Sequence, residues 1–384
     1  MNLRPFDADL CRGSYWAVEC RPLEMLVRIE GKRKLIGIFD GHNDSVQRIK
    51  EYHAGGIDFL ERSTSGHLDL PRAKEGGMIG GLFAMFVRPE QPPKNDLTVT
   101  EKNYEVRLAA PIDPAYARRE IAKQLAALKS LQDRGREKIR ITTSVDEIEK
   151  ARDDDAFAIV VHMEGAEAIG PDLHELDDLY RNGLRSLGLV WSRPNIFGHG
   201  VPFAWPRSPD TGPGLTAAGK DLVRECNRRG VMIDLSHLNE GGFWDVAKLS
   251  TTPLVATHSC VHAICGSTRN LTDKQLDAIR ESGGIVGINL CVNDIRPDAR
   301  HDENTSLEMV IRHFAYLADR LGVNHVAIGS DFDGATIPAP IADASGLPNL
   351  INSLREYGFD DTDLQKIAFE NWMRVLRVCL SQSH

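Results

Sequence analysis

Residues 216–237 read TAAGKDLVRECNRRGVMIDLSH, and this stretch carries the pattern that decides the fold. Thr216 is a helix N-cap residue type at the head of a helical pattern, which stops at Gly230. The short apolar run 231–235 follows at once and is typical of a buried strand. Polar residues then end the run, in Asp234-Leu235-Ser236-His237. The stretch therefore predicts a helix, a strand and a polar strand end.

The same alternation recurs along the chain. Residues 114–134 place aliphatic side chains on one helical stripe, with Gly135 as the expected C-cap, and residues 273–282 follow Thr272 as another helix. Val- and Ile-rich runs are expected to be strands at 35–40, 78–87, 157–162, 184–190, 231–235, 254–257, 284–290 and 325–329. This number of strands, alternating with helices, predicts an α/β fold of the (β/α)8 TIM-barrel type.

Length and composition predict one main domain. The chain has 384 residues, of which 42% are hydrophobic and 26% are charged, and it contains no repeat and no low-complexity linker. We expect residues 35–384 to form a single barrel domain. Residues 1–34 are expected to be a small N-terminal extension, a strand pair packed across one end of the barrel. The Pro-rich stretch 88–114 is expected to be a second decoration.

Charge and hydropathy argue against a nucleic-acid-binding, membrane-bound or secreted protein. The net charge is −9 and no basic run stands out, which argues against nucleic acid or an anionic membrane as a partner. The longest apolar stretches, 77–87 and 156–161, fall well short of the roughly 20 residues that span a bilayer. Asp7 and Asp9 lie where a secretory peptide would need its apolar core, and the seven cysteines form no CxxC pair. We expect a cytoplasmic protein.

Five predicted strand ends deliver His, Asp or Glu. They are Asp40-Gly41-His42-Asn43-Asp44, His162-Met163-Glu164-Gly165, Asp234-Leu235-Ser236-His237, Thr257-His258-Ser259 and Gly329-Ser330-Asp331-Phe332-Asp333-Gly334. His42 and Asp44 point to the same side, because side chains alternate along a strand. Imidazole with carboxylate suits Zn²⁺, and also Mn²⁺ or Fe²⁺, and the 13 histidines favour zinc. Any one of these residues alone is more typical of rim packing, whereas the set indicates a metal centre.

In the order and spacing of these motifs the chain resembles the membrane (renal) dipeptidase family of zinc peptidases. The resemblance runs from about residue 35 to Phe369-Glu370-Asn371-Trp372, and includes Gly214-Leu215-Thr216 and Thr268-Arg269-Asn270-Leu271-Thr272-Asp273. It implies a distorted barrel of the metal-dependent hydrolase kind in a bacterial-type cytoplasmic member. It further implies a dipeptidase that cleaves small dipeptides with a free C-terminal carboxylate and tolerates a D-residue at that end. Family members are often homodimers, and a homodimer is expected on that ground alone.

The resemblance also implies the metal ligands. By the family's pattern His42 and Asp44 bind one Zn²⁺, His237 and His258 bind a second, and Glu164 bridges the two ions together with a water or hydroxide. Two cations held about 3.5 to 4 Å apart need such an anionic bridge, and the bridging water would become the nucleophile near neutral pH. His162, two residues before Glu164, is expected either to support this site or to pack at the rim.

Catalytic and substrate-binding roles follow from the same resemblance. Asp331 matches the aspartate that takes the proton of the water and passes it to the leaving amine. Arg269 matches the residue that grips the terminal carboxylate. Mammalian members carry a substrate-contacting His after the fourth strand, where this chain has Trp191, as bacterial members often do. The contact to the developing oxyanion is therefore open, with His199 and Arg193 as candidates.

Two alternatives remain open from the sequence. The same metal core could serve a related amide hydrolase that acts on N-acyl amino acids or lactams. The chain could also be a catalytically inactive metal-binding relative, for which Trp191 in place of His is the sequence indication. Both alternatives keep the barrel and the metal ligands, so they differ from the dipeptidase in substrate or turnover.

Overall fold

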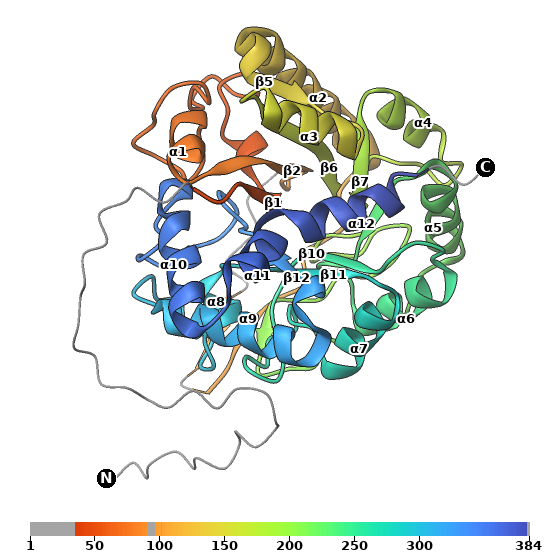
Figure 1. The fold of residues 1–384 in the computed structure, drawn as a ribbon. Coiled ribbons are helices and arrows are strands. Elements are labelled where there is room, and N and C mark those ends of the chain that lie inside the picture. The colour runs from red at the N-terminus through yellow and green to blue at the C-terminus, as the bar shows by residue number, and fades with distance from the viewer. Residues whose placement is uncertain (1–34, 91–96, 101, 382–384) are drawn as a thin grey trace, which may run out of the picture. The chain divides into compact units, whose positions relative to one another are not determined.

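The barrel is built from eight parallel strands, as the sequence predicts (Figure 1). The structure is a computed structural model that describes residues 35–90, 97–100 and 102–381. In spatial order the strands are β1 (Ile38–Asn43), β2 (Met78–Phe86), β6 (Phe157–Glu164), β7 (Leu184–Gly188), β9 (Met232–Asp234), β10 (Val255–Ser259), β11 (Ile285–Ile288) and β12 (Val326–Ile328). β5 (Ile139–Ile141) pairs with β6 beside this path. The fold is a TIM-type α/β barrel.

The closure between β12 and β1 is the irregular part of the barrel. One parallel bridge, between Asn43 and Phe332, joins the two strand ends. Side chains complete the seam, because the Asp40 carboxylate accepts hydrogen bonds from the Ser330 backbone N–H at 2.7 Å and from the Ser330 hydroxyl at 2.9 Å. A carboxylate thus replaces part of the backbone ladder where the barrel is distorted.

Helices cover the outside and one end of the barrel (Figure 1). They are α1 (Leu70–Glu75), α2 (Pro114–Gly135), α3 (Val145–Asp153), α4 (His174–Arg181), α5 (Ala217–Arg229), α6 (Glu240–Leu249), α7 (Asp273–Glu281), α8 (Val292–Ile295), α9 (Leu307–Leu321), α10 (Leu347–Tyr357), α11 (Asp361–Gln365) and α12 (Asn371–Cys379). Among the helices of the described ranges, none is long and apolar enough to cross a bilayer.

The predicted helix signals are confirmed for α5 and α7. The Thr216 side chain caps α5 by accepting from the Gly219 N–H, and Gly230 ends that helix at φ +70. Thr272 begins α7 with a capping box. The prediction that Gly135 is the C-cap of α2 is wrong, because Arg136 is the C-cap. Gly135 is the last residue of α2 and has an ordinary helical φ of −71, but a Cβ there would lie 2.7 Å from Ile139.

A second, antiparallel sheet decorates the barrel. It consists of β3 (Leu97–Val99), β4 (Tyr104–Val106) and β8 (Ala204–Trp205). The first two strands lie in the Pro-rich stretch expected to be a decoration, and the third comes from the long connection after β7. The strand pair expected within residues 1–34 lies outside the described residues.

The end of the barrel at which the strands begin is filled by an apolar cluster. Its largest member is Trp372 of α12, which crosses this end of the barrel (Figure 1). The Trp372 indole N–H donates to the Ile328 carbonyl at 3.0 Å, and Gly41 approaches so closely that a Cβ would lie 2.3 Å from the Trp372 ring. Buried side chains from several strands surround the indole, among them Phe39, Leu82, Val160 and Ile285. This cluster anchors the strands whose opposite ends carry the polar residues.

Candidate active site

The structure brings five predicted metal ligands together at the ends of four strands. His42 and Asp44 come from the end of β1, Glu164 ends β6, His258 lies on β10, and His237 follows β9 with a positive φ of +66. The Nε2 atoms of His237 and His258 are 3.0 Å apart and lie 3.0 and 3.5 Å from Glu164 Oε1. His42 Nε2 lies 3.7 Å from both Glu164 Oε1 and Asp44 Oδ2. Glu164 therefore belongs to two triplets of candidate ligands.

The electrostatics of this cluster fit divalent cations. Burial lowers the pKa of the His42 imidazole, but the Glu164 and Asp44 carboxylates outweigh burial and raise the pKa to about 10. Burial raises the pKa of Glu164 well above its ordinary value, and it lowers the pKa of His237 and His258 well below theirs. Neither ring nitrogen of His42 has a hydrogen-bond partner among the described residues. Buried carboxylates that crowd around imidazole nitrogens are what metal ions satisfy.

Hydroxyl groups behind the cluster orient two of the imidazoles. His258 Nδ1 lies 2.9 Å from the Thr257 hydroxyl, which donates to Asp234 Oδ2 at 2.6 Å. His237 Nδ1 lies 2.8 Å from the Ser192 hydroxyl. With Nδ1–H as donor in each pair, a tautomer inferred from these partners, both Nε2 lone pairs face the shared carboxylate. Such partners raise the basicity of a ligand and hold its ring in place.

His162 lies inside the barrel, behind the candidate ligands. Its ring meets the His42 ring edge-on with centroids 5.4 Å apart, and its Nδ1 lies 2.8 Å from the Ser186 hydroxyl. Burial lowers its pKa to about 4, although Asp234 acts in the opposite direction. The side chain is fully buried and contacts a ligand candidate. His162 is therefore an interior residue and not part of the barrel's rim.

Asp331 is fixed over the cluster by its backbone and by one amide. It follows β12 with a φ of +58, and its N–H donates to the His42 carbonyl at 3.0 Å. Asn289 Nδ2 donates to Asp331 Oδ2 at 3.0 Å. Burial raises the pKa of Asp331 to about 7, although the His42 charge lowers it. A Cβ on Gly334 would lie 2.0 Å from Asp44 Oδ2 and 2.4 Å from Asp331 Oδ1, so any other residue there would displace one or both carboxylates.

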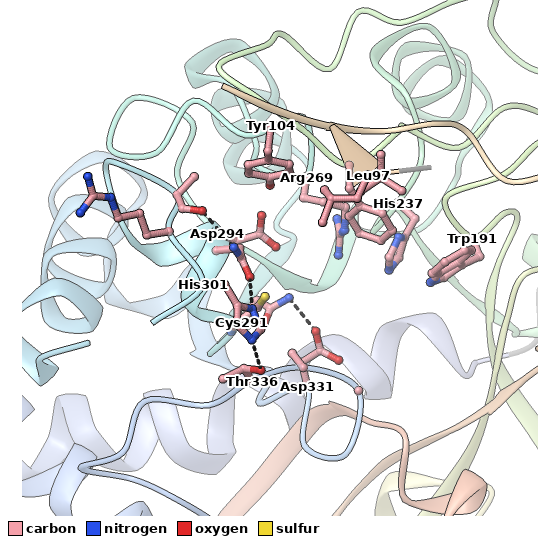
Figure 2. Close-up of a pocket in the computed structure, with 18 of the residues that line it drawn as sticks. Leu97, Tyr104, Trp191, His237, Arg269, Cys291, Asp294, His301, Asp331 and Thr336 are labelled. Atoms are coloured by element: carbon pink, nitrogen blue, oxygen red, sulfur yellow. Dashed lines mark hydrogen bonds between the residues drawn. The ribbon is translucent and has the colours of Figure 1, made fainter. Parts of the chain in front are cut away.

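Arg269 is a buried guanidinium with free donors. Its residue is 4% exposed, and its side chain makes one hydrogen bond, from Nη2 to the His258 carbonyl at 3.1 Å. Among the described residues no hydrogen-bond acceptor lies within reach of its Nε or Nη1. The backbone N–H of Arg269 donates to the Ser267 hydroxyl, which in turn donates to Asp294 Oδ1 at 2.8 Å. Arg269 thus lines the site with N–H groups available to an anion (Figure 2).

A cavity of about 820 Å³ opens over these residues (Figure 2). Its lining includes apolar and aromatic side chains, namely Leu97, Val99, Tyr104, Val106, Trp191 and Phe203. Polar and charged side chains also line it, namely Asn289, Asn293, Asp294, Arg300, His301 and Thr336. Asp44, Glu164, His237 and Arg269, although buried, border the cavity together with Asp331. A cavity of this size, with few convergent charged groups, is typical of a small-molecule site.

Trp191 and the two candidates for the carbonyl contact, His199 and Arg193, have different environments. Trp191 lines the cavity, with its ring 5.7 Å from that of His237. Arg193 is fully buried, donates from Nε to Glu167 at 2.6 Å and stacks behind Trp191 at 5.1 Å. Neither Arg193 nor His199 is among the described residues that line the cavity. The structure brings only Trp191 of these three to the site.

Several residues of the site were not singled out from the sequence. Asn289 lies at the end of a predicted strand, and this polar strand end was the signal that could have found it. Ser192 and Thr257 lie next to Trp191 and His258 in the sequence, but no motif shows that their hydroxyls orient imidazoles. Their roles depend on which side chains the fold places opposite them.

Comparison with known proteins agrees with this geometry. A family model described as membrane dipeptidase (peptidase family M19) matches residues 31–383. The chain belongs to this family. A metallo peptidase from Rhodobacter sphaeroides, solved with a phosphinate mimic of the dipeptide L-Ala-D-Ala, is 45% identical, with 90% of this chain and 100% of that chain covered and a TM-score of 0.85.

Two further relatives are also dipeptidases. The solved dipeptidase AC, a metallo peptidase of family M19, is 46% identical, with 91% and 100% of the two chains covered and a TM-score of 0.85. Dipeptidase tcpJ of Claviceps purpurea (strain 20.1) is 26% identical over 344 residues, which are 88% of this chain and 76% of that one. This member of the membrane dipeptidase family is therefore a metallo-dipeptidase, a hydrolase of peptide bonds.

Proposed function

We propose that the chain is a binuclear zinc dipeptidase that cleaves dipeptides with a free C-terminal carboxylate and tolerates a D-residue at that end. The observation that carries the proposal is the position of Glu164, which belongs to two ligand triplets beneath a cavity that also contains Arg269 and Asp331. The bound mimic of L-Ala-D-Ala in the Rhodobacter sphaeroides relative supports both the substrate class and the D-residue.

The ligand set supports two ions of zinc. His42 and Asp44 would hold one ion, His237 and His258 the other, and Glu164 would contribute to both. Three imidazoles with two carboxylates favour zinc over magnesium or calcium, which prefer oxygen ligands alone. When bound, a zinc pair supplies Lewis acidity toward the scissile carbonyl. It also lowers the pKa of a bound water to near neutrality.

Asp331 is the proposed proton carrier. Its carboxylate faces the cavity and is held through Oδ2 by the Asn289 amide. We propose that Asp331 accepts the proton of the attacking water and delivers it to the nitrogen of the leaving amine. Its backbone N–H is bonded to the His42 carbonyl, which keeps the carboxylate at a constant position relative to the ligands.

Arg269 is the proposed clamp for the terminal carboxylate. Its free N–H groups form a planar fork, and burial strengthens a charge-assisted pair in which both partners are satisfied. With the carboxylate at Arg269 and the scissile bond at the ligands, the N-terminal residue lies toward Trp191 and His237. A cytoplasmic location and a homodimer stay predictions from the sequence.

A substrate–enzyme double-mutant cycle at Arg269 tests the substrate class. Replacing the carboxylate of a dipeptide by an amide should lower kcat/KM of the wild type roughly 10- to 100-fold. Arg269→Lys should lower cleavage of the acid sharply and discriminate much less between acid and amide, because Lys cannot form the planar pair. Arg207→Lys, at an exposed arginine paired with Glu105 outside this cavity, should keep the wild-type ratio.

The cycle also separates the dipeptidase from the alternative amide hydrolase. An equal acid-to-amide ratio in wild type and Arg269→Lys would remove Arg269 as the clamp. Cleavage restricted to N-acylated substrates would favour the amide hydrolase instead. Bound metal without any turnover would support the inactive relative.

A further inference from the structure

Three polar side chains form a connected wall at one end of the cavity (Figure 2). Asn293 lies on α8, His301 lies between α8 and α9, and Thr336 lies in the loop after β12. His301 Nδ1 lies 3.0 Å from Asn293 Oδ1, and His301 Nε2 lies 3.2 Å from the Thr336 hydroxyl. Asn293 Nδ2 donates to the Ala299 carbonyl at 2.9 Å. Each side chain is thus held by a neighbour, which gives the wall a defined shape.

The hydrogen bonds of this wall determine what it can offer a ligand. Because Asn293 Nδ2 faces the Ala299 carbonyl, Asn293 Oδ1 must accept the His301 Nδ1–H. A neutral His301 then accepts the Thr336 hydroxyl proton at Nε2. What remains is the second N–H of the Asn293 amide and the lone pairs of the Thr336 oxygen. The wall therefore presents one donor and one acceptor.

This wall adjoins the turn that carries Arg269. The Ser267 hydroxyl accepts from the Arg269 N–H at 3.2 Å and donates to Asp294, the neighbour of Asn293, at 2.8 Å. Trp191 lies away from this wall, against His237 (Figure 2). In a dipeptide the C-terminal carboxylate and side chain share one α-carbon. Holding the carboxylate at Arg269 therefore directs that side chain to the polar wall.

Charged residues of both signs lie near the wall, so a charged side chain meets repulsion as well as attraction there. Asp294 is buried and lines the cavity next to Asn293, so it opposes an added carboxylate. Arg269 and Arg300 also line the cavity and oppose an ammonium group. An apolar side chain would leave the Asn293 N–H and the Thr336 oxygen without partners, which costs the desolvation of both groups.

We propose that Asn293, His301 and Thr336 form a subsite for the C-terminal side chain of the dipeptide and select an uncharged hydrogen-bonding group, an amide or a hydroxyl. The subsite rests on the proposed function, because Arg269 sets the direction of the dipeptide. Asn293 and Thr336 contact the side chain directly. His301 is a positioning residue, since both of its nitrogens are used within the wall.

Three nearly isosteric dipeptides test this subsite: Ala-Asn, Ala-Leu and Ala-Asp, each with an L- or a D-residue at the C-terminal position. We expect kcat/KM of the zinc-loaded wild type to be at least about tenfold higher for Ala-Asn than for Ala-Leu or Ala-Asp in the preferred configuration. Asn293→Leu should reduce the preference for Ala-Asn over Ala-Leu by at least about tenfold. The matched control Thr98→Val, at an exposed residue of β3 that does not line this cavity, should keep the wild-type preference.

The outcomes distinguish the subsite from the proposed function. Equal cleavage of Ala-Asn and Ala-Leu by the wild type, or an unchanged preference in Asn293→Leu, would overturn the subsite. Faster cleavage of Ala-Asp than of Ala-Asn would overturn its neutral character. If Asn293→Leu fails to fold, Thr336→Val and the wild-type series provide the same comparison. Failure of the proposed function would appear differently, as no cleavage of any of the three dipeptides.

Discussion

The two ends of the barrel are built from the same strands but have opposite chemistry. Along β1, Phe39 belongs to the apolar cluster around Trp372, whereas His42, three residues later, lies among the candidate metal ligands. Burying apolar side chains at the first end stabilises the fold by about 25 cal/mol for each Å² removed from water. Burying carboxylates and imidazoles at the second end costs free energy unless cations or hydrogen bonds satisfy them.

The residues that stabilise the fold and the residues that carry the chemistry are therefore separated along the strand direction. Glu164 ends β6, and Val160, four residues earlier on the same strand, lies in the apolar cluster. A substitution at one end should therefore leave the property of the other end almost unchanged. The following changes test that separation.

The largest effect is expected for Glu164→Ala at the polar end. Loss of the shared carboxylate removes a ligand from both triplets, so at least one zinc should be lost and turnover should fall below detection. The circular dichroism spectrum should stay that of the wild type, because the apolar cluster at the opposite end is untouched. Metal analysis of purified protein checks this. Two tightly bound ions with normal turnover in Glu164→Ala would refute the role of the bridge.

Asp331→Asn should lower kcat while metal content stays near two per chain. Asparagine keeps the shape of the side chain but cannot carry the proton, so we expect a loss of about 10²- to 10⁴-fold. Measuring kcat and zinc in one preparation checks the prediction. Loss of zinc in this variant would instead make Asp331 a ligand.

Trp372→Ala tests the apolar end of the barrel, where the strands begin. Removing a fully buried indole that also donates to Ile328 should lower the free energy of unfolding by about 3–5 kcal/mol. Urea unfolding of the metal-free protein measures this loss. The folded fraction should still bind zinc with wild-type affinity, and a zinc affinity that falls together with stability would show that the two ends are coupled.

Thr257→Val should have the smallest effect. The change keeps the shape of the side chain but removes the hydroxyl between His258 and Asp234. Zinc affinity, measured by competition with a chelator, should fall about 10- to 100-fold. Thr142→Val makes the same change at a buried residue beside β5 and should leave the zinc affinity unaltered. Equal affinities for Thr257→Val and wild type would mean that the hydroxyl does not orient His258.

The strands could be predicted from the sequence because each pairs a short apolar run with a polar end, as in residues 231–237. The sheet of β3, β4 and β8 could not, since its strands are at most three residues long and β8 pairs with a strand about 100 residues away. The candidate ligands could be placed because the family's motifs keep their spacing. Asn293 and Thr336 could not, because a one-turn helix and a loop bring them to the cavity.

The most direct test of the account is a zinc titration of metal-free protein. Bound zinc and dipeptide turnover are measured on the same samples as zinc is added. The account predicts two tight equivalents per chain, with turnover rising to a plateau as the second is filled, because Glu164 belongs to both ligand triplets. Full turnover with one equivalent or none would contradict the binuclear site.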